Sequence, residues 1–276
     1  VDPAGGCYVT GKFNGDSLIF GNIVLRNGEY STNTFLVKYN SDGEVLWAKC
    51  PNGTTSSGGI SISTDQQGNC YLAGYFYSST ITFDNIVLTG NVSEPGLKGG
   101  LFLVKYNTSG NVIWAKSYGT KHNDINSSIS VDAAGNSYIA GYFQGPEITF
   151  GTITLSTSGI YGGLYIVKYD ASGNVLWART APEAGNGGAQ AYSICAAPAG
   201  YFYVTGYFER ESITFGAITL INSRSTDYNG DAFLVKYDSD GNVIWAKNAG
   251  APFITGDRTI DIDAAGNSYL TGDVFV

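Results

Sequence analysis

The sequence predicts an all-β protein, a β-propeller built from repeats of about 65 residues, and three observations support this fold class. First, the tryptophans Trp47, Trp114, Trp177 and Trp245 recur 67, 63 and 68 residues apart. Second, the segments between turns are rich in β-branched and aromatic residues, and no window keeps a helical period. Third, these segments are apolar on both faces, which predicts sheets that are covered on both sides.

The third copy shows the elements of one repeat in order. Segment 128–132 and segment 136–143 read as two strands joined by the turn AAGN, in which glycine takes a positive φ. Segment 148–155, ITFGTITL, reads as a small hairpin that turns at Gly151-Thr152. After a loop, segments 164–169 and 174–179 form two further strands around the turn DASGN. A repeated four-stranded antiparallel sheet between copies of itself is a propeller blade.

Four full blades and a partial fifth fill the chain as a single repeat domain. The approximate repeats are 1–64, 65–131, 132–196 and 197–262, with a partial copy at 263–276. The extra hairpin explains why this blade is longer than the roughly 40 to 50 residues of familiar propeller repeats. Both termini supply the same strand pair, so the chain forms either a closed four-blade ring with redundant ends or an arc of a larger ring. We favour the arc; a β-solenoid is the rival fold, but its coils are usually much shorter.

The repeated motifs resemble the bacterial β-propeller repeats known as SBBP repeats. The third copy carries DAAGNSYIAG, ITFGTITL, LYIVKY and SGNVLWAR, and the neighbouring copies match equally well. Two departures are local: Ala197-Pro198 replaces the aspartate-containing turn, and Gly272-Asp273-Val274 replaces GYF. The resemblance implies an exported bacterial protein, secreted or at the cell surface, and it implies no single activity because the repeat is a scaffold.

The charge balance argues against nucleic-acid partners. The chain has 15 Lys plus Arg against 23 Asp plus Glu, a formal net charge of −8. Eight of the basic residues also occupy fixed repeat positions and cannot gather into a phosphate-binding patch. No stretch approaches the roughly 20 apolar residues of a membrane span. The chain begins Val1-Asp2 without a methionine or signal peptide, so we expect a processed or excerpted product.

No catalytic constellation, metal site or cofactor motif emerges, and the expected protein is not an enzyme. The turns 40–44 and 238–242 resemble the start of a calcium loop but lack the distal glutamate, so hairpin turns are the better interpretation. The single histidine, His122, lies in a loop without a nucleophile elbow. A glycosidase pair would need two converging loop carboxylates, and the sequence cannot show convergence. The candidates are Glu94, Glu147, Glu183, Glu209, Glu211 and Asp257.

Three further groups of residues have a simple structural interpretation. Tyr75, Tyr142 and Tyr207 recur at GYF and are expected to pack in the core, although exposed rings would stack on sugars. The cysteines lack zinc spacing, so we expect buried free thiols, with one disulfide still open; they are Cys7, Cys50, Cys70 and Cys195. Four N-x-S/T sequons fall in expected loops and are attributed to chance; they begin at Asn52, Asn91, Asn107 and Asn126.

The function expected from the sequence is that of a non-enzymatic extracellular scaffold. Its variable connections, which differ between copies while the frame repeats, would serve adhesion or recognition of a protein or glycan. A carbohydrate-binding or carbohydrate-active domain is one alternative. A structural module of a larger surface fibre, assembled from further repeats or like subunits, is another. The ligand and the ligand-binding residues stay unknown.

Overall fold

The computed structural model consists of antiparallel sheets and contains no helix among the residues it describes. These are residues 1–28, 31–53, 56–90, 100–119, 124–157, 162–184, 188–197, 200–209, 211–222, 230–252, 254–255, 259–263, 265–271 and 273–274. The all-β prediction is therefore confirmed. None of these residues belongs to a helix that is long and apolar enough to cross a membrane.

The first sheet has three strands and the next three sheets have four each. The first contains β1 (Cys7–Asn14), β4 (Thr32–Tyr39) and β5 (Val45–Lys49) in that order. The second contains β6 (Ser57–Thr64), β7 (Cys70–Phe76), β10 (Gly100–Tyr106) and β11 (Val112–Tyr118). The third contains β12 (Ile125–Val131), β13 (Ser137–Phe143), β16 (Gly163–Tyr169) and β17 (Val175–Arg179). The fourth contains β19 (Ala189–Ala196), β20 (Tyr201–Phe208), β23 (Asp231–Asp238) and β24 (Val243–Pro252).

A small hairpin separates the second and third strands of every sheet, as the sequence predicts. The hairpins are β2–β3 (Ser17–Phe20, Ile23–Arg26), β8–β9 (Thr80–Phe83, Ile86–Thr89), β14–β15 (Glu147–Phe150, Ile153–Ser156) and β21–β22 (Ser212–Phe215, Ile218–Ile221). The two-residue strand β18 (Glu183–Ala184) joins the last of them. At the end of the chain, β26 (Ile260–Ile262) pairs with β27 (Ser268–Leu270), and β25 (Ile254–Thr255) pairs with β28 (Asp273–Val274).

The sheets are offset by one strand from the sequence repeats. The first strand of the second sheet, β6, lies in the segment 1–64 that the sequence assigns to the preceding repeat. The first sheet lacks the equivalent strand, and the pair β26–β27 supplies only the two inner strands of a fifth sheet. Among the described strands, β1 pairs only with β4 and the sheets do not close into a ring. The number of blades therefore stays a prediction.

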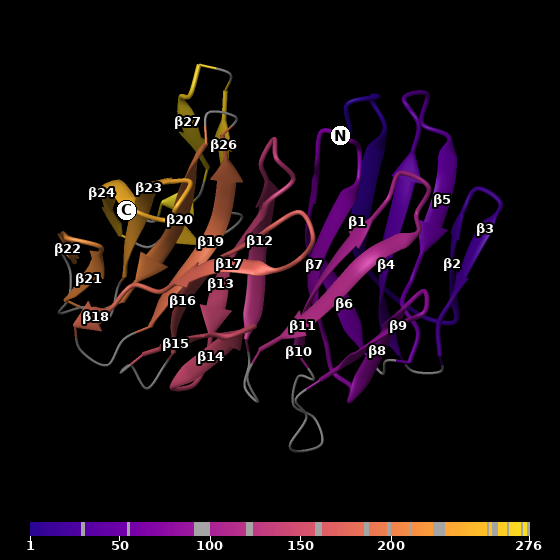
Figure 1. Ribbon diagram of the computed structural model, residues 1–276, viewed down its shortest axis with the longest axis horizontal. Helices are drawn as coiled ribbons and strands as arrows, with labels where there is room; N and C mark the ends of the chain where they lie inside the picture. The colour runs from indigo at the N-terminus through magenta and orange to yellow at the C-terminus, as the bar shows by residue number, and fades with distance from the viewer. Residues whose placement is uncertain are drawn as a thin grey trace.

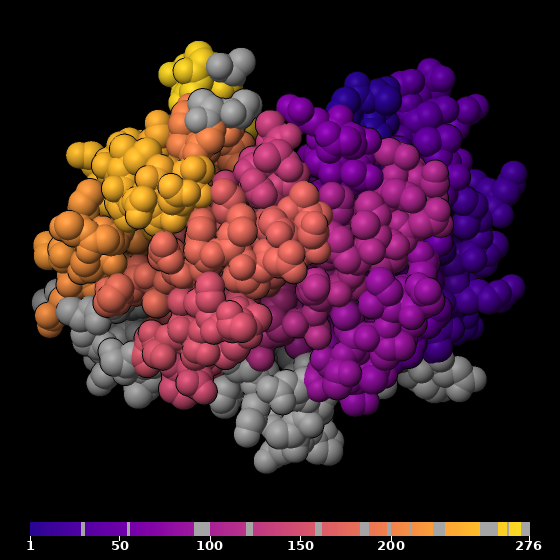
Figure 2. Space-filling view, in the orientation of Figure 1, coloured from indigo at the N-terminus to yellow at the C-terminus, as the bar shows by residue number. Residues whose placement is uncertain are grey.

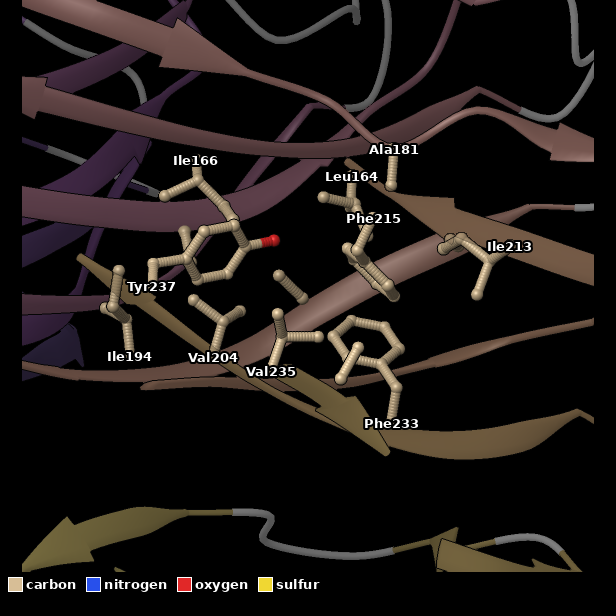
Figure 3. Packing of buried hydrophobic residues seen from close by; sticks show 14 of the residues in the cluster. Leu164, Ile166, Ala181, Ile194, Val204, Ile213, Phe215, Phe233, Val235 and Tyr237 are labelled. Carbon is tan, nitrogen blue, oxygen red and sulfur yellow. The ribbon is translucent and has the colours of Figure 1, made fainter. Parts of the chain in front are cut away.

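Consecutive sheets pack face to face and bury both sides of their central strands (Figure 1). Every residue of β10 and β16 is buried, which confirms the prediction that apolar side chains on both faces are covered. Between the third and fourth sheets, Ile166 and Leu164 of β16 lie against Val204, Phe233 and Tyr237 of the next sheet (Figure 3). Each such layer removes several aromatic and aliphatic side chains from water and holds neighbouring sheets together.

The outermost strands are covered on one face only. The residue that precedes each tryptophan is about half exposed, where the sequence analysis expected both faces to be buried. These residues are Leu46 at 52%, Ile113 at 48%, Leu176 at 50% and Ile244 at 51%. The expectation is wrong there because the fourth strand lies at the rim of each sheet, beyond the reach of the neighbouring sheet.

The glycine of the Y-x-x-G-Y-F motif is required by the close approach of the first and second strands. A Cβ at Gly141 would collide with the carbonyl oxygen of Ile125, and one at Gly206 would collide with that of Gln190. A larger side chain would therefore force the strands apart. The motif thus fixes the spacing of the first and second strands as well as the turn.

Candidate functional site

The variable connections gather at one end of the sheets and the short D-x-x-G-N turns at the other. In each four-stranded sheet the first and third strands run toward the tight turns, and the second and fourth strands run away from them. The turns β12–β13 and β26–β27 both project from the upper edge in Figure 1. We call this edge the turn end and the opposite edge, where β7, β13 and β20 finish, the loop end. Because the frame repeats and the connections differ, ligand specificity can only come from the loop end or from departures in the repeat.

Tyrosines of the GYF motif line the loop end and are half-buried. Tyr75 and Tyr77 form an edge-to-face pair with ring centroids 5.5 Å apart. Tyr192 and Tyr207 stack with centroids 5.4 Å apart and an interplanar angle of 11°. The sequence analysis expected the GYF tyrosines in the core, whereas the structure leaves part of each ring accessible. Stacked aromatic rings with accessible faces are typical of binding surfaces for sugars and apolar side chains.

The Tyr207 hydroxyl donates a hydrogen bond of 3.1 Å to Oε1 of Glu209. Burial raises the pKa of Tyr207 far above its usual value, and the neighbouring Tyr192 ring and Glu209 carboxylate raise it further. The phenol is therefore protonated at neutral pH and acts as a donor. This contact orients Glu209 at the loop end and gives the stacked pair a polar edge.

A bulge in the first strand of each four-stranded sheet places one additional residue at this end. The register shifts between Gly59 and Ser61 in β6, between Asn126 and Ser128 in β12, and between Ala191 and Ser193 in β19. The bulged residues are Ile60, Ser127 and Tyr192. They lie on neighbouring strands, since β6 contacts β12 and β12 contacts β19. The sequence analysis missed them; an interrupted alternation in segments 57–64, 125–131 and 189–196 was the available signal.

A buried polar network holds the loop end of the second and third sheets together. Asn126 Oδ1 accepts hydrogen bonds from the hydroxyls of Tyr118 at 2.7 Å and Tyr165 at 2.6 Å. Its amide donates to the carbonyl oxygens of Gly74 at 2.9 Å and Phe102 at 3.3 Å. Asn126 has no exposed surface, so this sequon lies in a strand and cannot carry a glycan, against the expectation of a loop. The network explains the asparagine as structural.

Two open grooves repeat along the rim of the molecule. One has a volume of about 460 Å³ and runs between Arg179, Pro182, Gly216 and Val243. The other, of about 360 Å³, occupies the same place one sheet earlier, between Lys116, Gly151 and Val175. At the preceding boundary Asp84 replaces the glycine, and its carboxylate lies 3.2 Å from Lys49 Nζ. The grooves follow from the repeat itself and carry no cluster of convergent side chains that would single out one of them.

Comparison with known proteins supports a repeat scaffold. No family model matches the chain. An uncharacterized WD repeat-containing protein of Acanthamoeba polyphaga mimivirus is 28% identical over 334 residues, which cover 99% of this chain and 23% of that protein. The chain thus spans less than a quarter of this curated relative. Together with the all-β sheets, this similarity suggests a propeller-like repeat protein; it does not confirm the bacterial SBBP family.

Solved structures add little to this comparison. A Bacteroides caccae protein of unknown function is 12% identical with a TM-score of 0.26, over 87% of this chain and 93% of that one. A structure of the eukaryotic initiation factor is 10% identical with a TM-score of 0.24, over 84% of this chain and 68% of that one. Such low scores carry no argument about the fold.

The two turns that resemble calcium loops are hairpin turns. Asp238 Oδ1 accepts from the backbone amides of Asp240 at 3.0 Å and Asn242 at 2.8 Å, and Asn40 accepts from its own turn in the same way. Hydrogen bonds from the side chain and backbone of Asn242 hold the pKa of Asp238 below its usual value. The carboxylate is therefore occupied by the donors of its own turn. In the described part of the chain, no group of three His, Cys, Asp or Glu residues could hold a metal ion.

The remaining candidates are scattered or lie outside the described residues. Glu147 and Glu211 are exposed, and the described contact of Glu209 is with Tyr207. His122, Glu94, Asp257 and the side chain of Glu183 lie outside the described residues, so a carboxylate pair is not tested.

The four cysteines are free in the structure. Cys70 is buried, Cys50 and Cys195 are half-buried, and Cys7 is exposed, so the expectation of four buried thiols is wrong for Cys7. Burial, with the nearby Asp261 carboxylate, raises the pKa of Cys195 to about 11. A thiol with so high a pKa is a weak nucleophile at neutral pH, which does not favour a catalytic role.

Proposed function

We propose that this chain is a non-enzymatic extracellular scaffold whose loop end recognises a protein or glycan ligand. The observation that carries the proposal is the segregation of the molecule into two ends. The tight turns are nearly identical from copy to copy, whereas the connections at the loop end differ in length and sequence. A rigid frame that holds dissimilar loops side by side is a general solution for binding surfaces. The exported, bacterial character of the protein rests on the resemblance of the repeat motifs alone.

The stacked tyrosines favour a glycan as one ligand class. Tyr192 and Tyr207 present an aromatic surface, and Glu209 beside them supplies a hydrogen-bond acceptor. Sugar rings bind through stacking on such surfaces combined with a few oriented polar groups. A carbohydrate-binding domain is therefore the second candidate function, and a carbohydrate-active enzyme would additionally need two converging carboxylates.

A binding screen with defined probes tests the proposal. The labelled chain is applied to a glycan array and to immobilised collagen, fibronectin and mucin, and hydrolysis of soluble polysaccharides is followed in parallel. We expect binding to at least one probe, loss of that binding on Tyr207→Ala, and no hydrolysis. Asp42→Asn, at the turn end, is the matched control and should bind normally. Absence of binding to every probe, or equal loss in both variants, would contradict the proposal; hydrolysis would replace it with the enzymatic alternative.

A further inference from the structure

The tryptophan of each outer strand donates a hydrogen bond to the turn of the next sheet. Nε1 of Trp47 lies 3.0 Å from the carbonyl oxygen of Thr108, and Nε1 of Trp114 lies 3.1 Å from that of Ala171. Nε1 of Trp177 lies 3.3 Å from the carbonyl oxygen of Ser239. The acceptor is always the second residue of the turn between the third and fourth strands. One contact thus recurs at three successive sheet boundaries.

A lysine reinforces the same contact at each boundary. Nζ of Lys38 and of Lys105 lies 3.4 Å from the carbonyl oxygen that the tryptophan binds, and Nζ of Lys168 lies 2.9 Å from its acceptor. Hydrogen bonds to a charged donor are stronger than neutral ones. Each boundary therefore combines two donors from one sheet with one carbonyl oxygen of the next.

The turn also needs a glycine where the tryptophan ring packs. An added Cβ would lie 2.8 Å from the Trp47 ring at Gly110, 3.0 Å from the Trp114 ring at Gly173 and 3.2 Å from the Trp177 ring at Gly241. These distances leave no room for a side chain. The indole ring thus lies directly on the turn backbone, and the glycine is part of the contact.

The fourth sheet presents the donors of this contact without an acceptor. Within the described residues, neither Trp245 Nε1 nor Lys236 Nζ donates a hydrogen bond to a protein group, although Lys236 lies 3.7 Å from the ring centroid of Tyr201. The inner half of the sheet is covered, because β26 contacts β19 and Tyr203 donates to the Gly266 carbonyl oxygen at 3.4 Å. The outer half, with Trp245 and Lys236, has no following turn.

The first sheet presents the acceptor of this contact without donors. Its turn 40–44 is exposed, and no described group donates to the Ser41 carbonyl oxygen. Nothing lies within 4 Å of a Cβ added at Gly43, in contrast to the glycines of the three later turns. Asp42 and Glu44 add negative charge around this turn, opposite in sign to Lys236. The two open ends are therefore complementary in shape, hydrogen bonding and charge.

We propose that a second copy of this chain docks head to tail, with its turn 40–44 on Trp245 and Lys236 of the first copy. The two ends lie on opposite sides of the molecule, separated by the second and third sheets, so they do not meet within one chain as it is folded here (Figure 2). A head-to-tail contact leaves a free end after each addition, so association continues into short linear assemblies. The inference is independent of the proposed ligand binding, because it uses the turns and outer strands and no residue of the loop end.

Sedimentation velocity with two complementary variants tests this contact. Trp245→Ala removes the donor end, and Gly43→Asn blocks the acceptor end, since asparagine tolerates a positive φ but its side chain occupies the site of the indole ring. We expect the unaltered chain to form a ladder of species between about 1 µM and 1 mM. Each variant alone should be monomeric, and a mixture of the two should form dimers only, through the one intact pair of ends. Ile244→Ala, one residue away on the opposite face, should associate like the unaltered chain.

The outcomes separate this contact from other arrangements. Circular dichroism first establishes that each variant is folded. A monomeric unaltered chain at every concentration overturns the proposal, and shows that ring closure or another repeat covers these ends instead. Association that both variants retain, or variants that fail to form dimers when mixed, overturns it as well. Loop-end variants such as Tyr207→Ala should associate normally, so a failed ligand screen leaves this result unaffected.

Discussion

Replacing Trp114 by alanine should destabilise the protein more than the same replacement at Trp245, although both lie in the segment VIWAK. Trp114 is only 9% exposed, packs on Gly173 and donates to the Ala171 carbonyl oxygen. A tryptophan buries up to roughly 250 Å², worth about 25 cal/mol per Å². After allowing for the alanine that remains and for a compact unfolded state, about 3–5 kcal/mol is lost at Trp114. At Trp245 the loss should be smaller by about 1–2 kcal/mol, because one hydrogen bond and one packing surface are absent.

Urea unfolding at low protein concentration measures this difference, since dilution prevents association from stabilising the Trp245 end. Fluorescence of the remaining tryptophans and circular dichroism should give coincident transitions if unfolding is two-state. Ile113→Ala, at a half-exposed rim position next to Trp114, is the matched control and should cost less than about 1.5 kcal/mol. Equal losses at Trp114 and Trp245 would refute the reasoning, because the contact with the following turn would then contribute nothing measurable.

Three further predictions concern buried polar groups. Asn126→Ala should cost about 3 kcal/mol in urea unfolding, because it leaves two buried hydroxyls and two carbonyl oxygens without their partner. Burial raises the pKa of Asp2, but hydrogen bonds from Lys38 and two backbone amides outweigh it and lower the pKa below 3.8. The resulting stabilisation is present above pH 3.8 and lost as the pH falls below it, so Asp2→Asn should flatten the acid branch of the pH–stability profile. Ser137→Ala should stabilise the chain by about 1 kcal/mol, because the buried Ser137 hydroxyl has no hydrogen-bond partner in the described structure; an unchanged midpoint would indicate an ordered water there.

The strands of each repeat could be predicted because their residues answer to local rules. Segment 164–169 alternates large apolar side chains on both faces and ends at a turn with glycine at positive φ, and both features reappear in β16 and its turn. The prediction failed at Ile113 because the pattern of one strand does not reveal how far the neighbouring sheet extends. It missed Tyr192 because a bulge shifts the side chain to the other face without changing composition.

The candidate site was harder to predict because it depends on differences between copies. The recurrence of GYF favours packing for Tyr207, and only the contacts with Tyr192 and Glu209 show a partly accessible stacked pair. Likewise, Trp47 and Gly110 are about sixty residues apart, so the contact between them follows from the stacking of sheets and from no local motif. Sequence repeats define what each sheet is, while function resides in what each sheet meets.

The departure at Ala197 shows how position in the stack relaxes the repeat. In the first two copies an aspartate at this place pairs with a buried lysine, Asp2 with Lys38 at 2.9 Å and Asp65 with Lys105 at 3.3 Å. Removing one partner of a buried ion pair is costly because it leaves an uncompensated charge in a medium of low dielectric. Lys236, the equivalent lysine of the fourth sheet, is only half-buried and lies over the Tyr201 ring, so water and the aromatic face replace the carboxylate. The loss of the aspartate is therefore tolerated where no following turn covers the lysine, and the same uncovered surface leaves Trp245 free to bind another copy.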